Sequence, residues 1–170
     1  HGRIVNPKLC HDGRYVEHTG YITDIMNGLA VEFLEKQEGD KPWSLFFAHK
    51  AVHPDAHQAA DGTLDMSRFG GYLPAERHRG LYADGVFPRK PNMLSTRALV
   101  KQKPAWAEAF ALKGSERSRA LLDAIQAGSQ EEIRQRARMM ASVDEGVGML
   151  LAALARRKKL DDTLILFLGD

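Results

Sequence analysis

The sequence predicts an α/β domain in which a largely parallel central sheet is flanked by helices. Two observations carry this prediction: helical periodicity occurs twice, and each time a short apolar run typical of a strand buried on both faces follows it. Because helices are the usual connections between parallel strands, two helix-then-strand units favour this class. The 170 residues contain no internal repeat and no low-complexity tract.

The first element is a helix predicted over residues 23–37. Thr23 is expected to cap its start, and Gly39 follows its end. The run WSLFFA at residues 43–48 is the first predicted buried strand. Five apolar residues of the helix fall on one face at 3.6 periodicity and are expected to be buried: Ile25, Met26, Leu29, Phe33 and Leu34.

The middle of the chain, residues 52–103, is rich in proline and glycine. Aromatic and apolar residues punctuate it, so we expect long functional loops there rather than a linker. A shorter helix is expected over residues 115–127, with Leu121, Leu122 and Ile125 as its apolar side.

The strongest local signal is a long helix predicted over residues 130–158. Ser129 and Glu132 form a capping box at its start. We expect the small residues Gly146 and Gly148 to allow close helix packing. The predicted buried stripe is Ile133, Ala137, Met140, Val143, Val147, Leu150, Leu151 and Leu154. After a turn, the apolar run at residues 164–168 is the second predicted strand.

Composition limits the function. Hydrophobic residues make up 44% of the chain and charged residues 27%, and 24 Lys+Arg against 22 Asp+Glu give a net charge of +2. This near balance does not indicate a nucleic-acid partner. No run reaches the roughly 18 apolar residues of a membrane span. The single cysteine excludes a disulfide framework and a multi-cysteine zinc site.

Chemistry is expected where the two predicted strands end, because sites in open parallel sheets lie outside the carboxyl ends of the strands. His49, Lys50 and His53 follow the first strand, and Asp170 follows the second. The histidines and the lysine could hold an anion, and the carboxylate could hold Ca²⁺ or Mg²⁺. On the residues alone, His53 could equally be a hydrogen-bonded loop histidine, and Asp170 a turn residue.

Zinc is a weaker alternative for this region. His49, His53 and His57 lie four residues apart, which on a helix would place three imidazoles on one face. Pro54 argues against a helix here, and no glutamate follows His49 as the H-E-x-x-H pattern requires. We therefore do not favour zinc.

Two further clusters have a structural and a functional interpretation. Cys10 beside a histidine could be a nucleophile, but we favour an incidental thiol in an irregular loop. For the Arg77-His78-Arg79 cluster we favour a solvated loop. The alternative is that these side chains hold an anionic substrate.

Four segments, in order, resemble the sulfatases of the alkaline-phosphatase superfamily: GYITDI, KPWSLFFAHKAVHPD, PAERHRGLY and MMASVDEGVGMLLAALARRKKLDDTLILFLGD. The resemblance extends over residues 6–170 and is to the branch of glucosamine-6-sulfatases and related heparan- or mucin-type sulfatases. The segment SVDEGVG with LDDTLILFLGD is its most specific part. HKAVHP resembles the family loop H-K-A-P-H-x-P, with Val52 where proline is usual.

The resemblance implies a metal-dependent sulfatase acting on sulfated glycans, with a formylglycine nucleophile. Carried over by position, His53 contacts the sulfate and helps to protonate the leaving oxygen, and Lys50 is a weaker candidate for a sulfate contact. Asp170 matches a ligand of Ca²⁺, with Mg²⁺ as the alternative. Cys10 and Arg14 have the spacing of the family motif C/S-x-P/A-x-R, but Asp12 replaces its Pro or Ala. The formylglycine is therefore expected outside this chain.

From the same resemblance we expect residues 1–170 to be the central part of a single sulfatase catalytic domain, truncated at both ends and inactive alone. The expected partner is a sulfated carbohydrate, and the expected compartment is periplasmic, secreted or lysosomal. Two alternatives stay open. One is a phosphate or phosphonate ester hydrolase of the same superfamily. The other is a non-catalytic domain that binds an anionic glycan through basic loops at residues 77–79 and at Arg89 and Lys90.

Overall fold

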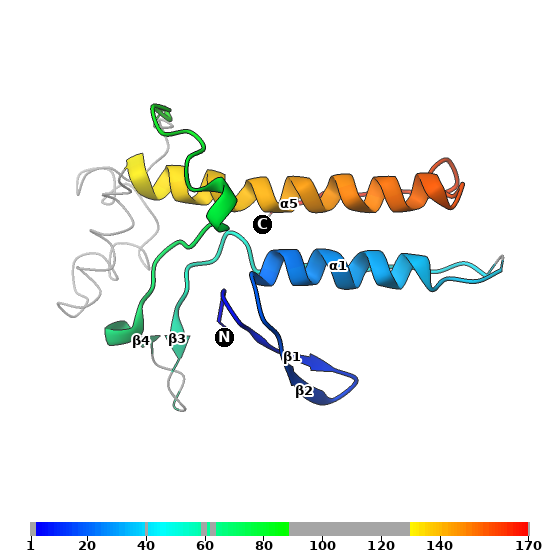
Figure 1. Ribbon diagram of the computed structural model, residues 1–170, viewed down its shortest axis with the longest axis horizontal. Helices are drawn as coiled ribbons and strands as arrows, with labels where there is room; N and C mark the ends of the chain where they lie inside the picture. Colours follow the sequence, from blue (N-terminus) through cyan, green and yellow to red (C-terminus); the bar gives the residue numbers. More distant parts are fainter. Residues whose placement is uncertain (1–2, 40, 59–60, 62–63, 89–129, 170) are drawn as a thin grey trace, which may run out of the picture. The chain divides into compact units, whose positions relative to one another are not determined.

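The computed structural model describes residues 3–39, 41–58, 61, 64–88 and 130–169 (Figure 1). The chain divides into two compact units, His1–Leu81 with Gln135–Asp170, and Tyr82–Arg134. The first unit holds most of the described secondary structure. Four sequence predictions lie outside the described residues: the helix over 115–127, the cap at Ser129, the basic pair Arg89 and Lys90, and Asp170.

Two helices, α1 (Ile22–Glu35) and α5 (Gln130–Arg156), confirm the two main helix predictions to within about two residues at each end. Their contacts advance together along the chain: Asn27 bonds to Ser142, and Leu34 packs with Ala153 and Leu154. The two helices therefore run side by side in the same direction (Figure 1). None of the helices in the part of the chain described here has the length and apolar character needed to cross a membrane.

The most buried stripe of each helix differs from the predicted one. On α1 only Leu34 of the five predicted residues is fully buried; on α5, Val143 and Leu154 are buried, but Met140 and Leu151 are 38% and 37% exposed. Small and polar residues take the contact between the helices because they let the backbones approach. Apolar periodicity does not detect them. They are Asn27, Ser142 and Gly146.

Thr23 does not cap α1, so that prediction was wrong. The N-cap is Tyr21, which makes no side-chain cap hydrogen bond, and Thr23 lies buried within the first turn. The amide of Ile22 instead donates to the carbonyl of Ile4 at 2.8 Å. A backbone partner from the N-terminal segment thus satisfies a donor that a side chain would otherwise have to satisfy.

Two antiparallel hairpins complete the first unit. Strands β1 (Lys8–His11) and β2 (Arg14–Glu17) pair with Lys8 opposite Glu17. Asp12 and Gly13 between them both have positive φ, 49° and 82°, as a two-residue hairpin turn requires. The second hairpin joins β3 (His57–Gln58) to β4 (Leu64–Asp65). Short 3₁₀ turns, η1 (Met66–Arg68) and η2 (Glu76–His78), follow it.

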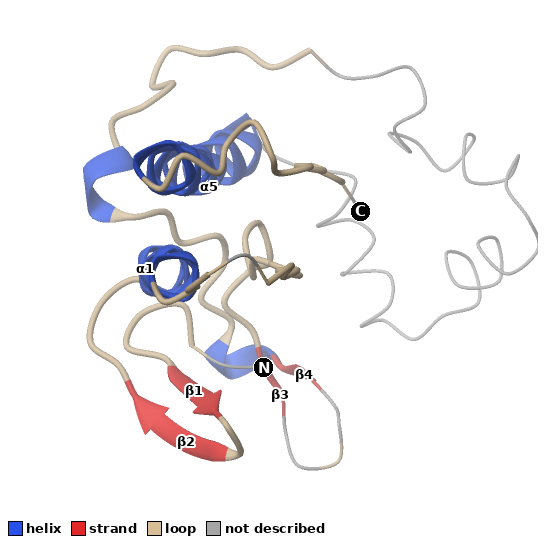
Figure 2. Ribbon diagram, turned by 90° about the vertical axis from the view of Figure 1, so that its right-hand side faces the viewer, coloured by secondary structure: helices blue, strands red, loops and turns tan. Residues whose placement is uncertain are grey.

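The predicted parallel sheet is not seen among the described residues, where strands pair only in these two antiparallel sheets. Neither predicted strand, 43–48 or 164–168, forms a ladder there. Some of their apolar side chains are open to solvent: Phe46 is 96% exposed and Leu164 is 84% exposed. Both segments lie on one side of the α1–α5 pair, and η2 lies on the other (Figure 2). An apolar segment becomes a sheet strand only when a neighbour pairs with its backbone.

In the described part of the chain, the buried apolar residues form two clusters, one toward each end of α1. Ile4, Ile22 and Met139 form the first, and Leu34, Ala153 and Leu154 form the second. Apolar residues from the segment that follows α1 reach both clusters. The core therefore ties that segment to the helices along its length.

Candidate functional site

The candidate catalytic loop, residues 49–54, is anchored by its own apolar residues. Ala51 and Val52 pack against the cluster of Ile4, Ile22 and Met139, at the start of α1. At the other end of the preceding segment, Trp43 packs on the second cluster, and its ring meets Phe33 edge-on at 6.0 Å. The segment therefore runs back along α1. Lys50 and His53 lie on either side of the anchored pair.

His53 lies in a turn that presents its side chain to solvent. Its amide donates to the carbonyl of Lys50 at 2.8 Å, which closes the turn. The ring Nδ1 lies 2.7 Å from the carbonyl oxygen of Pro54. Because a carbonyl oxygen only accepts, Nδ1 carries the hydrogen. In the neutral ring, Nε2 is therefore the nitrogen that carries the lone pair.

The two residues before the anchored pair are half-buried, and burial changes their titration. Burial lowers the pKa of the Lys50 ammonium, and the nearby Asp55 carboxylate partly opposes this effect. Burial also lowers the pKa of His49, whose ring lies 4.2 Å from the Phe47 ring centroid. Among the described residues, the buried Nδ1 of His49 has no hydrogen-bond partner. Burial thus favours the neutral form of His49, while Asp55 favours the charged form of Lys50.

Asp55 is a positioning residue that the sequence analysis did not single out. Its Oδ1 accepts from the amide of Ile4 at 3.4 Å. Its backbone amide donates to Gly71 at 2.7 Å, and its carbonyl accepts from Gly70 at 2.8 Å. The residue directly after the loop is therefore held by the N-terminal segment and by residues 70–71. The only sequence signal was an acid directly after the His-Pro pair.

The described residues do not form a metal centre by themselves. Within them, no group of three His, Cys, Asp or Glu side chains is placed to hold an ion, so His49, His53 and His57 do not gather as zinc ligands. His57 belongs to β3, opposite Asp65. The structure leaves the role of Asp170 untested because that residue lies outside the described part.

Arg77 and His78 form a structural network rather than a solvated loop. Arg77 donates two bonds to Asp24, at 2.7 and 2.8 Å, and also pairs with Glu145. The buried His78 contacts Glu145 through Nε2 at 2.8 Å and Ser142 through Nδ1 at 3.0 Å. These bonds tie η2 to both helices. The carboxylates already occupy the guanidinium, so it is not available to hold a substrate anion.

Cys10 lies on β1, opposite Tyr15, as an exposed free thiol. The residues before and after it belong to the same strand, and β2 follows it, so no helix begins at Cys10. The interpretation of an incidental thiol stays a prediction. The expected irregular loop is instead a regular hairpin.

Comparison with known proteins identifies the family. The family model described as Sulfatase matches residues 4–170. The match extends over far more than half of the chain, so the chain belongs to the sulfatase family. The family inferred from the sequence is thereby confirmed.

Two curated relatives and one solved structure are similar to this chain. An N-acetylglucosamine-6-O-sulfatase of Bacteroides thetaiotaomicron is 24% identical over 221 aligned residues, covering 99% of this chain and 36% of the relative. An arylsulfatase of Volvox carteri is 28% identical over 154 residues, covering 88% of this chain and 22% of the relative. The chain thus spans about a third or less of these relatives.

The solved structure is of a protein in complex with its substrate, D-glucosamine-2-N,6-O-disulfate. It matches with a TM-score of 0.58 at 21% identity, over 95% of this chain and 40% of that one. At this identity the likeness concerns the fold alone. It supports the α/β class, while the parallel sheet stays a prediction.

Proposed function

We propose that the protein hydrolyses sulfate esters of sulfated amino sugars, with the loop of residues 49–54 at its active site. The observation that carries the proposal is the loop itself. In a member of the sulfatase family, Lys50 and His53 flank a pair of core-anchored residues, and the His53 tautomer leaves Nε2 to exchange a proton. The names of the relatives support the choice of sugar.

The chemistry asks for two things that this loop offers. Negative charge on the sulfate oxygens must be balanced, and the departing alkoxide must receive a proton. The Lys50 ammonium suits the first task. Protonated His53 suits the second task. Its Nε2–H can donate to the leaving oxygen while its Nδ1–H keeps the hydrogen bond to the carbonyl of Pro54. Both roles are part of the proposal.

The family resemblance also implies a divalent ion and a formylglycine. We propose Ca²⁺, or else Mg²⁺, with Asp170 as one ligand; such an ion would place positive charge at the sulfate oxygens. No described residue is proposed as the formylglycine. Asp55 is proposed to hold the loop in place, since it bonds both to the N-terminal segment and to residues 70–71.

The test is sulfate release by the native protein from glucosamine 6-sulfate, with glucosamine 6-phosphate as the competing substrate. We expect sulfate release that is lost on chelation of divalent ions and restored by adding Ca²⁺ or Mg²⁺. Faster release of phosphate would instead favour the phosphatase alternative.

Two variants connect the activity to the loop. His53→Gln is expected to lower kcat about 100-fold to 10,000-fold, the usual contribution of a general acid. Lys50→Gln is expected to raise KM and lower kcat. His11→Gln changes a histidine of the β1–β2 hairpin and is the matched control. Equal activity of His53→Gln and His11→Gln would contradict the proposed site.

A further inference from the structure

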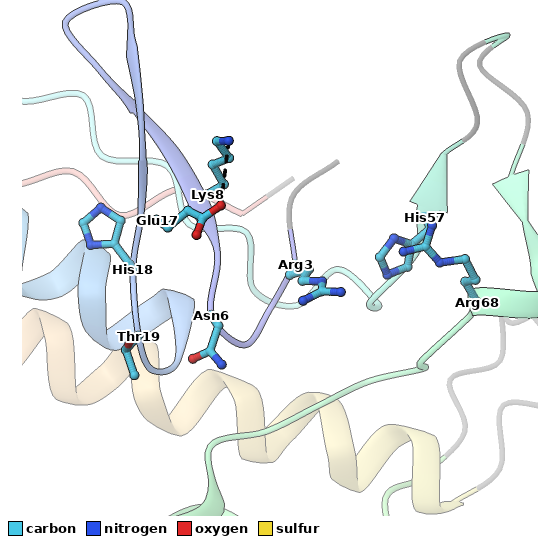
Figure 3. Close-up of a pocket in the computed structure, with 8 residues that line it drawn as sticks. All are labelled: Arg3, Asn6, Lys8, Glu17, His18, Thr19, His57 and Arg68. Atoms are coloured by element: carbon cyan, nitrogen blue, oxygen red, sulfur yellow. Dashed lines mark ion pairs between the residues drawn. The ribbon is translucent and has the colours of Figure 1, made fainter.

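A second feature of the first unit lies outside the candidate loop. It is a hollow of about 530 Å³ between the β1–β2 hairpin and the β3–β4 hairpin, with the N-terminal segment between them (Figure 3). We call it the basic hollow, because three basic side chains line it: Arg3, Lys8 and Arg68. Its volume is within the range of sites for small ligands.

The positive charge of the basic hollow is only partly balanced. Within the described part of the chain, Arg3 and Arg68 make no ion pair and no hydrogen bond. Lys8 lies 3.8 Å from Glu17, the carboxylate of the lining. Three cations thus face one lining carboxylate.

Two histidines and one neighbouring acid complete the polar groups around the basic hollow. His18 and His57 line it. Asp65 lies near Arg68, and its pKa is lowered chiefly by the hydrogen bonds from Ser67, with a smaller contribution from Arg68. Asp65 is already engaged with the amide and hydroxyl of Ser67, at 3.1 and 2.6 Å. An excess of positive charge remains for a ligand.

The neutral groups of the lining suit a sugar. The Oδ1 of Asn6 accepts from the amide of Gly20 at 2.8 Å, which leaves its Nδ2 as a donor toward a ligand. Thr19 adds an exposed hydroxyl. The described residues of the lining include no Phe, Tyr or Trp, so they offer no stacking surface of the kind typical of nucleic-acid sites. A guanidinium fork with two neutral polar groups matches an anionic sugar.

We infer that the basic hollow binds a second anionic group, a sulfate or a carboxylate, on an extended sulfated glycan whose scissile ester lies at the candidate loop. This inference rests on the proposed function for its substrate class. His57 lines the hollow and follows His53 by four residues, so a short stretch of chain joins the hollow to the candidate loop. Arg3 and Arg68 carry the recognition.

The binding experiment uses the native protein and a heparin-derived oligosaccharide, compared with the same backbone after chemical desulfation. We expect Arg3→Gln and Arg68→Gln each to weaken binding of the sulfated form about tenfold. Arg14→Gln, an exposed arginine of β2 outside the hollow, is the matched control and should not weaken it. The affinity of Arg68→Lys should lie between those of the wild type and Arg68→Gln, because lysine keeps the charge but lacks the two parallel N–H donors of the guanidinium.

Three results would overturn the inference. They are equal losses in Arg14→Gln and Arg68→Gln, equal affinity for the desulfated backbone, and equal or tighter binding of a single-stranded polynucleotide. The two arginines are exposed, so their variants should keep the fold, which circular dichroism checks. Binding of the wild type should also weaken as salt rises, and more steeply than binding of the double variant that combines Arg3→Gln with Arg68→Gln.

A kinetic experiment separates this inference from the proposed function. If both hold, the double variant raises KM for the sulfated oligosaccharide and leaves hydrolysis of glucosamine 6-sulfate unchanged. If the wild type hydrolyses neither substrate, the proposed function fails, and the binding experiment alone decides the hollow. If the double variant loses hydrolysis of both substrates equally, the hollow is not a separate site.

Discussion

Asn27 of α1 and Gly146 of α5 lie in direct contact, and a Cβ atom added at Gly146 would overlap the side-chain amide of Asn27. Both residues are buried, and the Nδ2 of Asn27 donates to the carbonyl of Ser142 at 3.0 Å. This contact sets how closely the two helices approach. Ile22 and Met139, one from each helix, form the cluster that anchors Ala51 and Val52, so the contact also bears on the candidate loop.

Gly146→Ala is expected to destabilise the protein by about 1–3 kcal/mol, the usual effect of overpacking a tight contact. Gly148→Ala is the matched control, because nothing lies within 4 Å of the added carbon. In that exposed helical position alanine should stabilise by up to about 1 kcal/mol. Urea denaturation measures both changes. A loss of stability in Gly148→Ala as large as in Gly146→Ala would show that helix packing is not the cause.

Arg77→Ala should lower the free energy of unfolding by about 1–2 kcal/mol, because two carboxylates on two helices lose one guanidinium. The side chain is 44% exposed, so each pair alone should contribute less than about 1 kcal/mol. Arg79→Ala removes a more exposed pair with Glu76 and is expected to change stability by less than about 0.5 kcal/mol. Arg77→Lys should not restore stability, since lysine lacks the fork. Full restoration by lysine would count against the bidentate contact.

The carboxylate of Glu145 should make stability depend on acid pH. The Arg77 hydrogen bond, with a smaller contribution from His78, holds the pKa of Glu145 below its ordinary value. A lowered pKa in the folded state means that the stabilisation is present above the ordinary glutamate pKa of about 4.3 and is lost as pH falls through the lower folded value. Asp24 faces the same guanidinium and is held constant in the comparison.

The measurement is the urea midpoint of wild type and Glu145→Gln between about pH 6 and pH 3. Wild type should be more stable at pH 6, by less than about 1 kcal/mol because the carboxylate is half exposed. The difference should shrink toward pH 3. Parallel pH profiles for the two proteins would show that Glu145 does not carry the effect.

His53→Gln should reduce hydrolysis of a sugar sulfate far more than hydrolysis of 4-nitrophenyl sulfate, which needs no proton for its leaving group. A general acid contributes about 100-fold to 10,000-fold where the leaving group is a poor one. The measurement is kcat for both substrates in the native protein. If the variant lost the same factor on both, His53 would act in binding and not as a proton donor.

Some features of the fold could be predicted from the sequence. Where the predictions failed, the failure has a physical cause. Helical periodicity placed α1 and α5 within about two residues of their ends, because the pattern is local. It misjudged the tightest face, where Asn27 and Ser142 are polar yet buried. The cap of α1 was missed because its partner, the carbonyl of Ile4, comes from 18 residues away in the sequence.

The candidate site, like the fold, could be predicted only in part from the sequence. The family and the loop of His53 and Lys50 were recognisable from motifs along the chain, and the family match confirms the first. The catalytic roles of both residues stay predictions. Other contacts join residues far apart in the sequence. Asp55 accepts a hydrogen bond from Ile4, and Arg77 pairs with Asp24 and Glu145. No rule of sequence spacing predicts such pairs.

The sequence by itself determined the family, the two helices and the loop that carries Lys50 and His53, because each depends on residues close together in the chain. Only the tertiary structure decided which small and polar residues join α1 to α5, which carboxylates occupy Arg77, and that two hairpins enclose the basic hollow. These features depend on contacts between distant segments. Their free energy comes from burial and pairing that exist only once the chain has folded.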